Sequence, residues 1–143
     1  MASANVDLVR SILAAWEEGD LRSVGWVDPQ IEFVFVDGPV PGTWRGVAGL
    51  AQAFRDFLSA WEGFRVIVDE VRELDDERVL ALTHAGGRGR GSGVELADAQ
   101  ATAGRMAHLF HVRGAKVIKL VVYFDRARAL AELGLTQEAR SAP

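Results

Sequence analysis

The sequence contains no cysteine, which excludes disulfide bonds, thiolate catalysis and zinc sites built on cysteine. It also has no apolar run that approaches the ~20 residues needed to cross a bilayer, so we expect no contact with a membrane. The N-terminal residues lack the basic and apolar segments of a secretory signal. These absences favour a protein of a reducing compartment, with the cytoplasm as the default location.

Basic residues are in the minority. The chain has 16 Lys and Arg against 20 Asp and Glu, a formal net charge of -4, whereas a protein that grips a phosphate backbone needs clustered Lys and Arg. We therefore expect no nucleic-acid partner. The apolar fraction of 49% over 143 residues predicts one soluble domain with a sizeable core.

No cofactor or metal motif is recognisable. The glycine-rich residues 86–93 satisfy neither GxGxxG nor GxxxxGK[ST] and have no following helix to hold a phosphate, so they read as a flexible connection between strands. Of the three histidines, His108 and His111 point to opposite faces of one predicted strand. We expect neither a metal site nor a bound cofactor.

Helical periodicity dominates the first half of the chain. Val6, Val9, Leu13 and Trp16 share one face of a helix over residues 5–18, and Asp20 is placed to cap a short helix that ends before Asp28-Pro29. A longer helix ends at Gly63. Its apolar stripe comprises Val47, Leu50, Phe54, Phe57, Leu58 and Trp61.

Period-two alternation predicts the strands, first over Ile31–Asp37 and then over residues 64–74, 78–88, about 94–113 and 116–124. Asp125 is placed to cap a last helix over residues 126–133. Helices followed by an antiparallel meander predict an α+β fold, in which a curved antiparallel sheet, shaped as a cone, wraps around the N-terminal helices. We expect a single domain over residues 1–143, with an ordered core of about 5–134.

Asp37 is the most informative polar residue of the first strand. It shares a face with Ile31, Phe33 and Phe35, which aims a carboxylate at an apolar interior. Burial of an unpaired charge is costly, so this residue has a partner, reaches water or has a function. The alternative is that Asp37-Gly38 merely starts a turn, a position that favours aspartate.

His108 is the second candidate. A three-residue loop at 113–115 places His108 opposite Leu120 and Phe110 opposite Ile118, and Met106 then lies opposite Val122. One imidazole thus interrupts an apolar face that lines the cone. Such a histidine can donate a hydrogen bond or transfer a proton near neutral pH; otherwise it is a core histidine with satisfied hydrogen bonds.

Three segments carry a resemblance to a known family: residues 15–21 (AWEEGDL), 44–46 (WRG) and 108–117 (HLFHVRGAKV). With the order of elements, they resemble the nuclear transport factor 2-like superfamily over about residues 5–134, in its SnoaL-like and ketosteroid isomerase-like branch. The resemblance implies the α+β cone. The fold hosts enzymes as well as proteins without known activity, so function must be argued from the site.

The resemblance also implies roles for individual residues. Asp37, nine residues before Gly46, matches the general base of ketosteroid isomerase, and His108 stands where that family has an acidic oxyanion donor. Ile12 occupies the position of the family's essential tyrosine, so steroid isomerisation is not expected. Asp125 and His111 resemble pocket residues of SnoaL-like cyclases by their distance from Gly134, although Asp125 also has the role of a helix cap.

These considerations predict a hydrophobic pocket for a small apolar molecule. Its expected lining is Phe33, Phe35, Trp44, Phe57, Phe110, Leu120 and Phe124; Trp16 and Trp61 read as core. An enzyme of isomerase, cyclase or dehydratase type would use Asp37 as base and His108 as polariser on a carbonyl-bearing substrate. A non-catalytic binder of an apolar ligand and a protein-interaction module are the alternatives.

The outward face of the last two strands mixes apolar with charged residues. Leu109, Val121 and Tyr123 alternate there with Arg105, His111 and Lys119. A face of this composition is more typical of an interface than of a solvated sheet. We therefore expect a homodimer formed through the outer face of the sheet.

Overall fold

The computed structural model describes residues 3–20, 25–37, 41–59, 61–89 and 105–135. Its elements are α1 (Ala4–Glu17), β1 (Val27–Phe35), β2 (Gly42–Arg45), α2 (Gly46–Leu58), β3 (Trp61–Glu73), β4 (Arg78–Gly89), β5 (Arg105–Arg113), β6 (Lys116–Tyr123) and α4 (Arg126–Glu132). The six strands form one sheet in the order β2-β1-β6-β5-β4-β3. The predicted α+β class is confirmed, and one strand pair, β1 with β6, is parallel.

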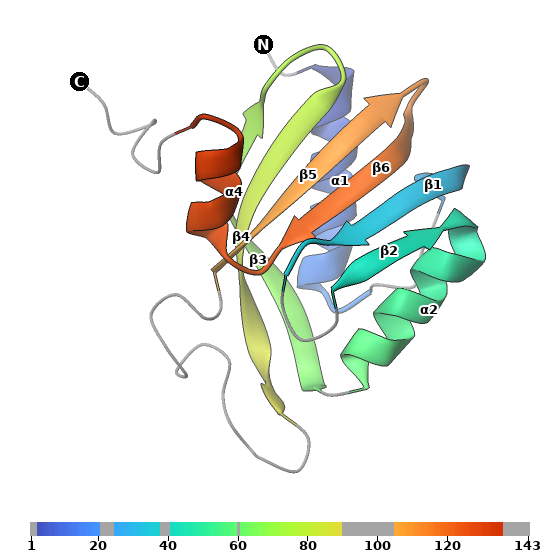
Figure 1. The fold of residues 1–143 in the computed structure, drawn as a ribbon, viewed down its shortest axis with the longest axis vertical. Helices are drawn as coiled ribbons and strands as arrows, with labels where there is room; N and C mark the ends of the chain where they lie inside the picture. Colours follow the sequence, from blue (N-terminus) through green and yellow to red (C-terminus); the bar gives the residue numbers. More distant parts are fainter. Residues whose placement is uncertain (1–2, 21–24, 38–40, 60, 90–104, 136–143) are drawn as a thin grey trace.

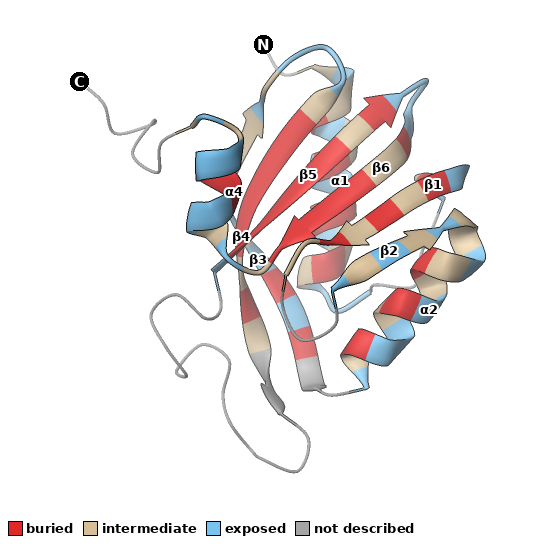
Figure 2. Ribbon diagram, viewed as in Figure 1, coloured by how far each residue is buried: buried red, intermediate tan, exposed pale blue. Residues whose placement is uncertain are grey.

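The helices lie on both faces of this curved sheet (Figure 1). Apolar residues of α1 and α2 pack with the inward residues of the strands in one large core, whereas α4 belongs to a second cluster on the outward face. Figure 2 shows that the buried residues concentrate along β4, β5 and β6, which are covered on both sides. The inward face therefore carries the main core, and it is the place to look for a ligand site.

The cap predicted for the last helix is confirmed: Asp125 caps α4 by accepting from Arg128 N at 3.3 Å. The helix predicted over residues 5–18 is α1, and its N-cap, which was not predicted, is Ser3, whose side chain accepts a hydrogen bond from Val6 N at 3.0 Å. The prediction for α2 was wrong at its end: the helix stops at Leu58, and Trp61 begins β3. A tryptophan three residues beyond the helix fits the helical stripe and a strand equally well.

The short helix predicted over residues 20–27 is not observed where the structure describes this segment. Residues 21–24 lie outside the described residues, and Val27 already begins β1. Pro29 is accommodated inside β1 because the register with β6 is irregular between Val27 and Glu32, where a missing N–H breaks no ladder bond. The chain at Gly42–Arg45 forms β2 against β1, a strand that the sequence analysis missed.

The β5–β6 hairpin keeps the predicted faces but not the predicted pairs. The turn has two residues, Gly114 and Ala115, both with positive φ, and the register shifts between His111 and Val112. His108 therefore lies opposite Val122 and Phe110 opposite Leu120. The shift relative to the prediction is two residues, and because side chains alternate with a period of two, the inward set is unchanged.

The outward face of the sheet is largely covered within the chain. Leu109, Val121 and Tyr123 are buried in a cluster with Ala129 and Leu130 of α4. The apolar residues on which the homodimer prediction was based therefore pack against α4. The part of the predicted strand before Arg105, residues 94–104, lies outside the described residues.

Candidate functional site

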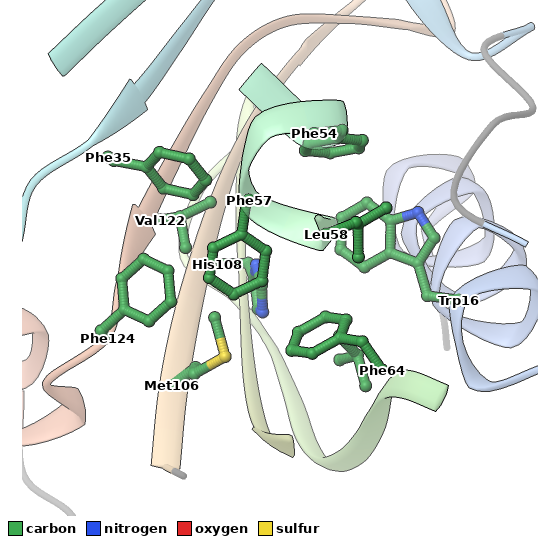
Figure 3. Close-up of a pocket in the computed structure, with 11 residues that line it drawn as sticks. Trp16, Phe35, Phe54, Phe57, Leu58, Phe64, Met106, His108, Val122 and Phe124 are labelled. Carbon is green, nitrogen blue, oxygen red and sulfur yellow. The ribbon is translucent and has the colours of Figure 1, made fainter. Parts of the chain in front are cut away.

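A pocket of about 380 Å³, counting the part open to solvent, lies on the inward side of the sheet. Five phenylalanine rings and the indole of Trp16 supply most of its wall, as Figure 3 illustrates. The lining residues are Trp16, Phe35, Phe54, Phe57, Leu58, Phe64, Val66, Met106, His108, Val122 and Phe124.

The aromatic rings of the wall come from separate elements and contact one another. Phe57 of α2 lies 5.0 Å from Phe64 of β3 and 5.4 Å from Phe124, which follows β6. Phe35 of β1 lies 5.3 Å from Phe124. Ring pairs at such distances are attractive beyond the area they bury. The wall thus combines a large apolar surface with side chains that hold one another in place.

His108 is the one polar side chain of the lining. It is 3% exposed, and Figure 3 shows its imidazole surrounded by apolar side chains. Burial lowers the pKa of His108 to about 3, because the charged imidazolium would lose its hydration. His108 is therefore neutral at physiological pH, where its low basicity suits it to hydrogen bonding rather than to accepting a proton.

The two ring nitrogens of His108 have different surroundings. Nε2 lies 3.1 Å from the hydroxyl oxygen of Thr83, which is itself fully buried on β4. Nδ1 is buried and has no hydrogen-bond partner among the described residues. A buried polar atom without a partner is destabilising. One residue of this apolar wall therefore carries a buried ring nitrogen that has no hydrogen-bond partner among the described residues.

Asp37, the other predicted catalytic residue, is not part of the lining. Its Oδ1 accepts a hydrogen bond from Phe124 N at 2.6 Å, and its Oδ2 lies 3.9 Å from Arg128 Nη1. Oδ2 is buried and has no hydrogen-bond partner in the described part of the chain. Asp37 therefore joins the end of β1 to the start of α4, beside the pocket rather than within it.

The predicted substrate-binding residues divide into two groups. Phe35, Phe57 and Phe124 line the pocket together with His108. Phe33, Phe110 and Leu120 are fully buried in the core around it. The ring of Trp44 lies 5.5 Å from that of Phe35, and Trp44 is not among the lining residues.

Sequence reasoning missed several members of the site. Trp16, read as core, lines the pocket and lies 5.4 Å from the His108 ring. Thr83 was not singled out, although it is the one polar residue among the inward positions Val79, Ala81, Thr83 and Ala85 of β4. The signal available in the sequence was this single polar residue in an otherwise apolar alternating set. The other lining residues that were not predicted are Phe54, Leu58, Phe64, Val66, Met106 and Val122.

The residues compared with cyclases lie elsewhere. Asp125 is the cap of α4, and His111 is half-buried beyond the pocket, where burial and the charges of Lys119 and Arg78 lower its pKa. Within residues 3–20, 25–37, 41–59, 61–89 and 105–135, no group of three His, Asp or Glu side chains is arranged to hold a metal ion. No helix in these ranges is both long enough and apolar enough to cross a membrane.

Comparison with known proteins places this geometry in a family. Residues 9–120 match the family model of the SnoaL-like domain. No curated protein matches the sequence. An NTF2-like protein of unknown function from Burkholderia pseudomallei has a TM-score of 0.71 at 20% identity, over 91% of this chain and 97% of that one.

Two further solved structures contain small molecules. A protein with a ketosteroid isomerase-like fold from Catenulispora acidiphila, in complex with trimethylamine, has a TM-score of 0.66 at 19% identity, over 91% of this chain and 94% of that one. TerC, co-crystallised with polyporic acid, has a TM-score of 0.66 at 22% identity, over 92% of this chain and 98% of that one. At these identities the likeness extends to the fold.

Proposed function

The chain belongs to the family of SnoaL-like domains, and from this premise we propose that it binds a small, largely apolar, carbonyl-bearing molecule in the aromatic pocket. The observation that carries the proposal is the unpartnered Nδ1 of His108 in that wall. A ligand that fills the pocket and hydrogen-bonds to Nδ1 would remove the cost of this buried polar atom while burying its own apolar surface.

Binding is favoured over acid–base chemistry by what the lining contains. General acid–base catalysis requires a group whose pKa lies near the working pH. The pKa of His108 is about 3 because of burial, and the described lining has no carboxylate. His108 then orients the ligand oxygen and polarises its carbonyl without exchanging a proton.

The test is a comparison of two bicyclic ligands of matched shape. 1-Indanone carries a carbonyl oxygen, whereas indene carries none. We expect 1-indanone to bind more tightly than indene by about tenfold, the ratio for one well-formed hydrogen bond, and to raise the melting temperature accordingly. Isothermal titration and thermal shift both measure this difference.

A matched pair of histidine variants makes the test specific. His108→Phe keeps a ring in the wall and should abolish the preference for 1-indanone, whereas His111→Asn, outside the pocket, should leave the preference intact. Equal binding of the two ligands to the wild-type protein, or an unchanged preference in His108→Phe, would overturn the proposal.

A catalytic role for Asp37 is the second candidate. It is favoured by Asp37 Oδ2, a buried oxygen without a hydrogen-bond partner among the described residues, which lies 3.9 Å from Arg128 Nη1. In this version the protein is an isomerase, cyclase or dehydratase, with Asp37 as base and His108 as polariser. Asp37→Asn would then abolish turnover of a carbonyl substrate while binding is retained; unchanged turnover would exclude the role.

A further inference from the structure

We propose that Thr83 is the residue that decides which kind of ligand the pocket selects, because its hydroxyl fixes the tautomer of His108 with the proton on Nδ1. The inference rests on the proposed ligand site and deepens it. With the proton on Nδ1, this nitrogen is a hydrogen-bond donor, and the pocket selects ligands that carry an acceptor.

The geometry isolates this pair from other partners. Thr83 lies on β4 opposite Met106, and His108 lies opposite Ala81, so the two side chains are diagonal neighbours on the inward face. Thr83 is 0% exposed and His108 3%. Within the described residues, the His108 ring is the only hydrogen-bond partner of the Thr83 hydroxyl.

A neutral imidazole carries one ring proton, so the pair has two arrangements. In the first, the Thr83 hydroxyl donates to Nε2, and the ring proton is on Nδ1. In the second, Nε2–H donates to the hydroxyl oxygen, which leaves the hydroxyl proton without an acceptor and Nδ1 with a bare lone pair. An imidazole nitrogen is a better acceptor than a hydroxyl oxygen, and only the first arrangement gives the hydroxyl proton an acceptor, so the first arrangement is favoured.

The aromatic surroundings favour the same arrangement. The faces of aromatic rings carry partial negative charge, which attracts an N–H group and repels a lone pair. The His108 ring lies 5.4 Å from the Trp16 ring at an interplanar angle of 58°, and it lines a pocket walled by phenylalanines. Among these rings a protonated Nδ1 is therefore favoured over a bare one.

Thr83 is itself held in position through its backbone. Its carbonyl oxygen accepts a hydrogen bond from Arg126 Nη2, and Arg126 Nε donates to the carbonyl of Met106 at 3.4 Å. Arg126 thus ties together the two strands that carry Thr83 and His108. The hydroxyl is thereby held beside Nε2, as is required of a residue that sets a tautomer.

The tautomer is measured directly in the ligand-free protein. Two-bond ¹H–¹⁵N spectra of histidine distinguish a protonated from an unprotonated ring nitrogen, and His108→Phe identifies the signals among the three histidines. We expect Nδ1 protonated in the wild type and in Thr83→Ser, and a shift toward the Nε2–H form in Thr83→Val. Nε2–H in the wild type, or the same tautomer in Thr83→Val, would overturn the inference.

The ligand arm uses three bicyclic probes: 1-indanone as acceptor, indole as donor and indene as neither. In the wild type and in Thr83→Ser we expect 1-indanone to bind about tenfold more tightly than indene, and indole to have no advantage. In Thr83→Val the advantage of 1-indanone should shrink by several-fold, and that of indole should appear.

The two arms separate the possible failures. An unchanged ranking of the three probes in Thr83→Val would overturn the role of Thr83 in selection. If no probe binds the wild-type protein, the proposed function fails, and the spectra alone decide whether Thr83 sets the tautomer. Far-ultraviolet circular dichroism of each variant establishes that the fold is kept, and Thr83→Ser provides the conservative control.

Discussion

The carboxylate of Asp37 holds the backbone of Phe124: its Oδ1 accepts a hydrogen bond from the Phe124 N–H at 2.6 Å. The ring of Phe124 lines the pocket, whereas Asp37 does not. This contact joins the second residue after β1 to the first residue after β6, and these two strands are the parallel pair of the sheet. It gives Asp37 a structural role, whether or not the residue also has a chemical one.

Replacing Asp37 separates the two roles. Asp37→Ala leaves the Phe124 N–H without its acceptor, so we expect the free energy of unfolding to fall by about 1–3 kcal/mol. Asp37→Asn keeps an oxygen that accepts the bond and should cost less than about 1 kcal/mol. Guanidinium unfolding measures both, with the exposed Asp56→Ala as a control. Equal losses in the two Asp37 variants would show that the hydrogen bond contributes little.

Burial of His108 predicts a pH dependence of stability. The pKa of His108 is about 3 in the folded protein because of burial, against about 6.5 in an unfolded chain. Between these values the unfolded chain binds one proton more, so the free energy of unfolding falls as the pH falls. The slope from this residue is at most about 1.4 kcal/mol per pH unit.

The measurement is chemical unfolding between pH 5 and pH 7. The free energy of unfolding should depend less steeply on pH in His108→Phe than in the wild type. Subtracting one profile from the other cancels the contributions of all other titratable groups. His111→Asn should reduce the dependence on pH less, because His111 is only half-buried, although its pKa is lowered in the same direction. Parallel profiles for wild type and His108→Phe would contradict the burial of a neutral imidazole.

The faces of the strands were predictable, but their partners were not. Alternation of side chains is local, so the inward position of His108 and Phe110 follows from sequence alone. Which residue lies opposite depends on turn length and bulges. The two-residue turn at Gly114-Ala115 and the register shift beside His111 moved the pairing by two residues and left the faces unchanged.

The site was predictable only in part for related reasons. His108, Phe35, Phe57 and Phe124 were named, since a histidine on an apolar face and aromatic residues in a core-facing pattern are visible in a sequence. The position of Asp37 depends on where β1 ends, and beyond Phe35 the alternation no longer governs side-chain direction. Thr83 contacts His108, a diagonal neighbour on another strand, and this contact can be predicted only when the register of the two strands is known.

Truncation of Leu130, the buried leucine of α4, tests whether this helix covers the outward face of the sheet. Leu130 is 2% exposed and packs with Leu109 and Val121, so we expect Leu130→Ala to cost about 2–5 kcal/mol. A helix as short as α4 does not persist without packing, and an uncovered apolar face promotes association. Light scattering should then show self-association.

Ala127→Ser, an exposed change on the same helix, is the control, and wild-type light scattering tests the predicted homodimer. Because Leu109, Val121 and Tyr123 are already buried, a wild-type dimer would have to use the polar part of this face or another surface. Unchanged scattering and stability in Leu130→Ala would show that α4 is not what covers the sheet.

Arg126 and Asp69 offer the last test, because their contact supports the strands that carry the pocket. Arg126 Nη2 donates to Asp69 Oδ2 as well as to the Thr83 carbonyl, and His84 Nδ1 lies 2.8 Å from Asp69 Oδ1. Burial raises the pKa of Asp69, but the hydrogen bonds with Arg126 and His84 outweigh it, so the pKa lies below its ordinary value.

Arg126→Gln should therefore raise the pKa of Asp69, measured by ¹³C spectra of its carboxyl group. An aspartate whose pKa is lowered by folding stabilises the folded protein at pH values above its unfolded pKa of about 3.8, and this stabilisation is lost as the pH falls through the folded pKa. The variant should therefore lose stability at neutral pH. His84→Gln, which keeps Arg126, should produce a smaller rise. An Asp69 pKa that does not move in Arg126→Gln would show that this ion pair does not couple α4 to β3, and that Thr83 is held by the sheet alone.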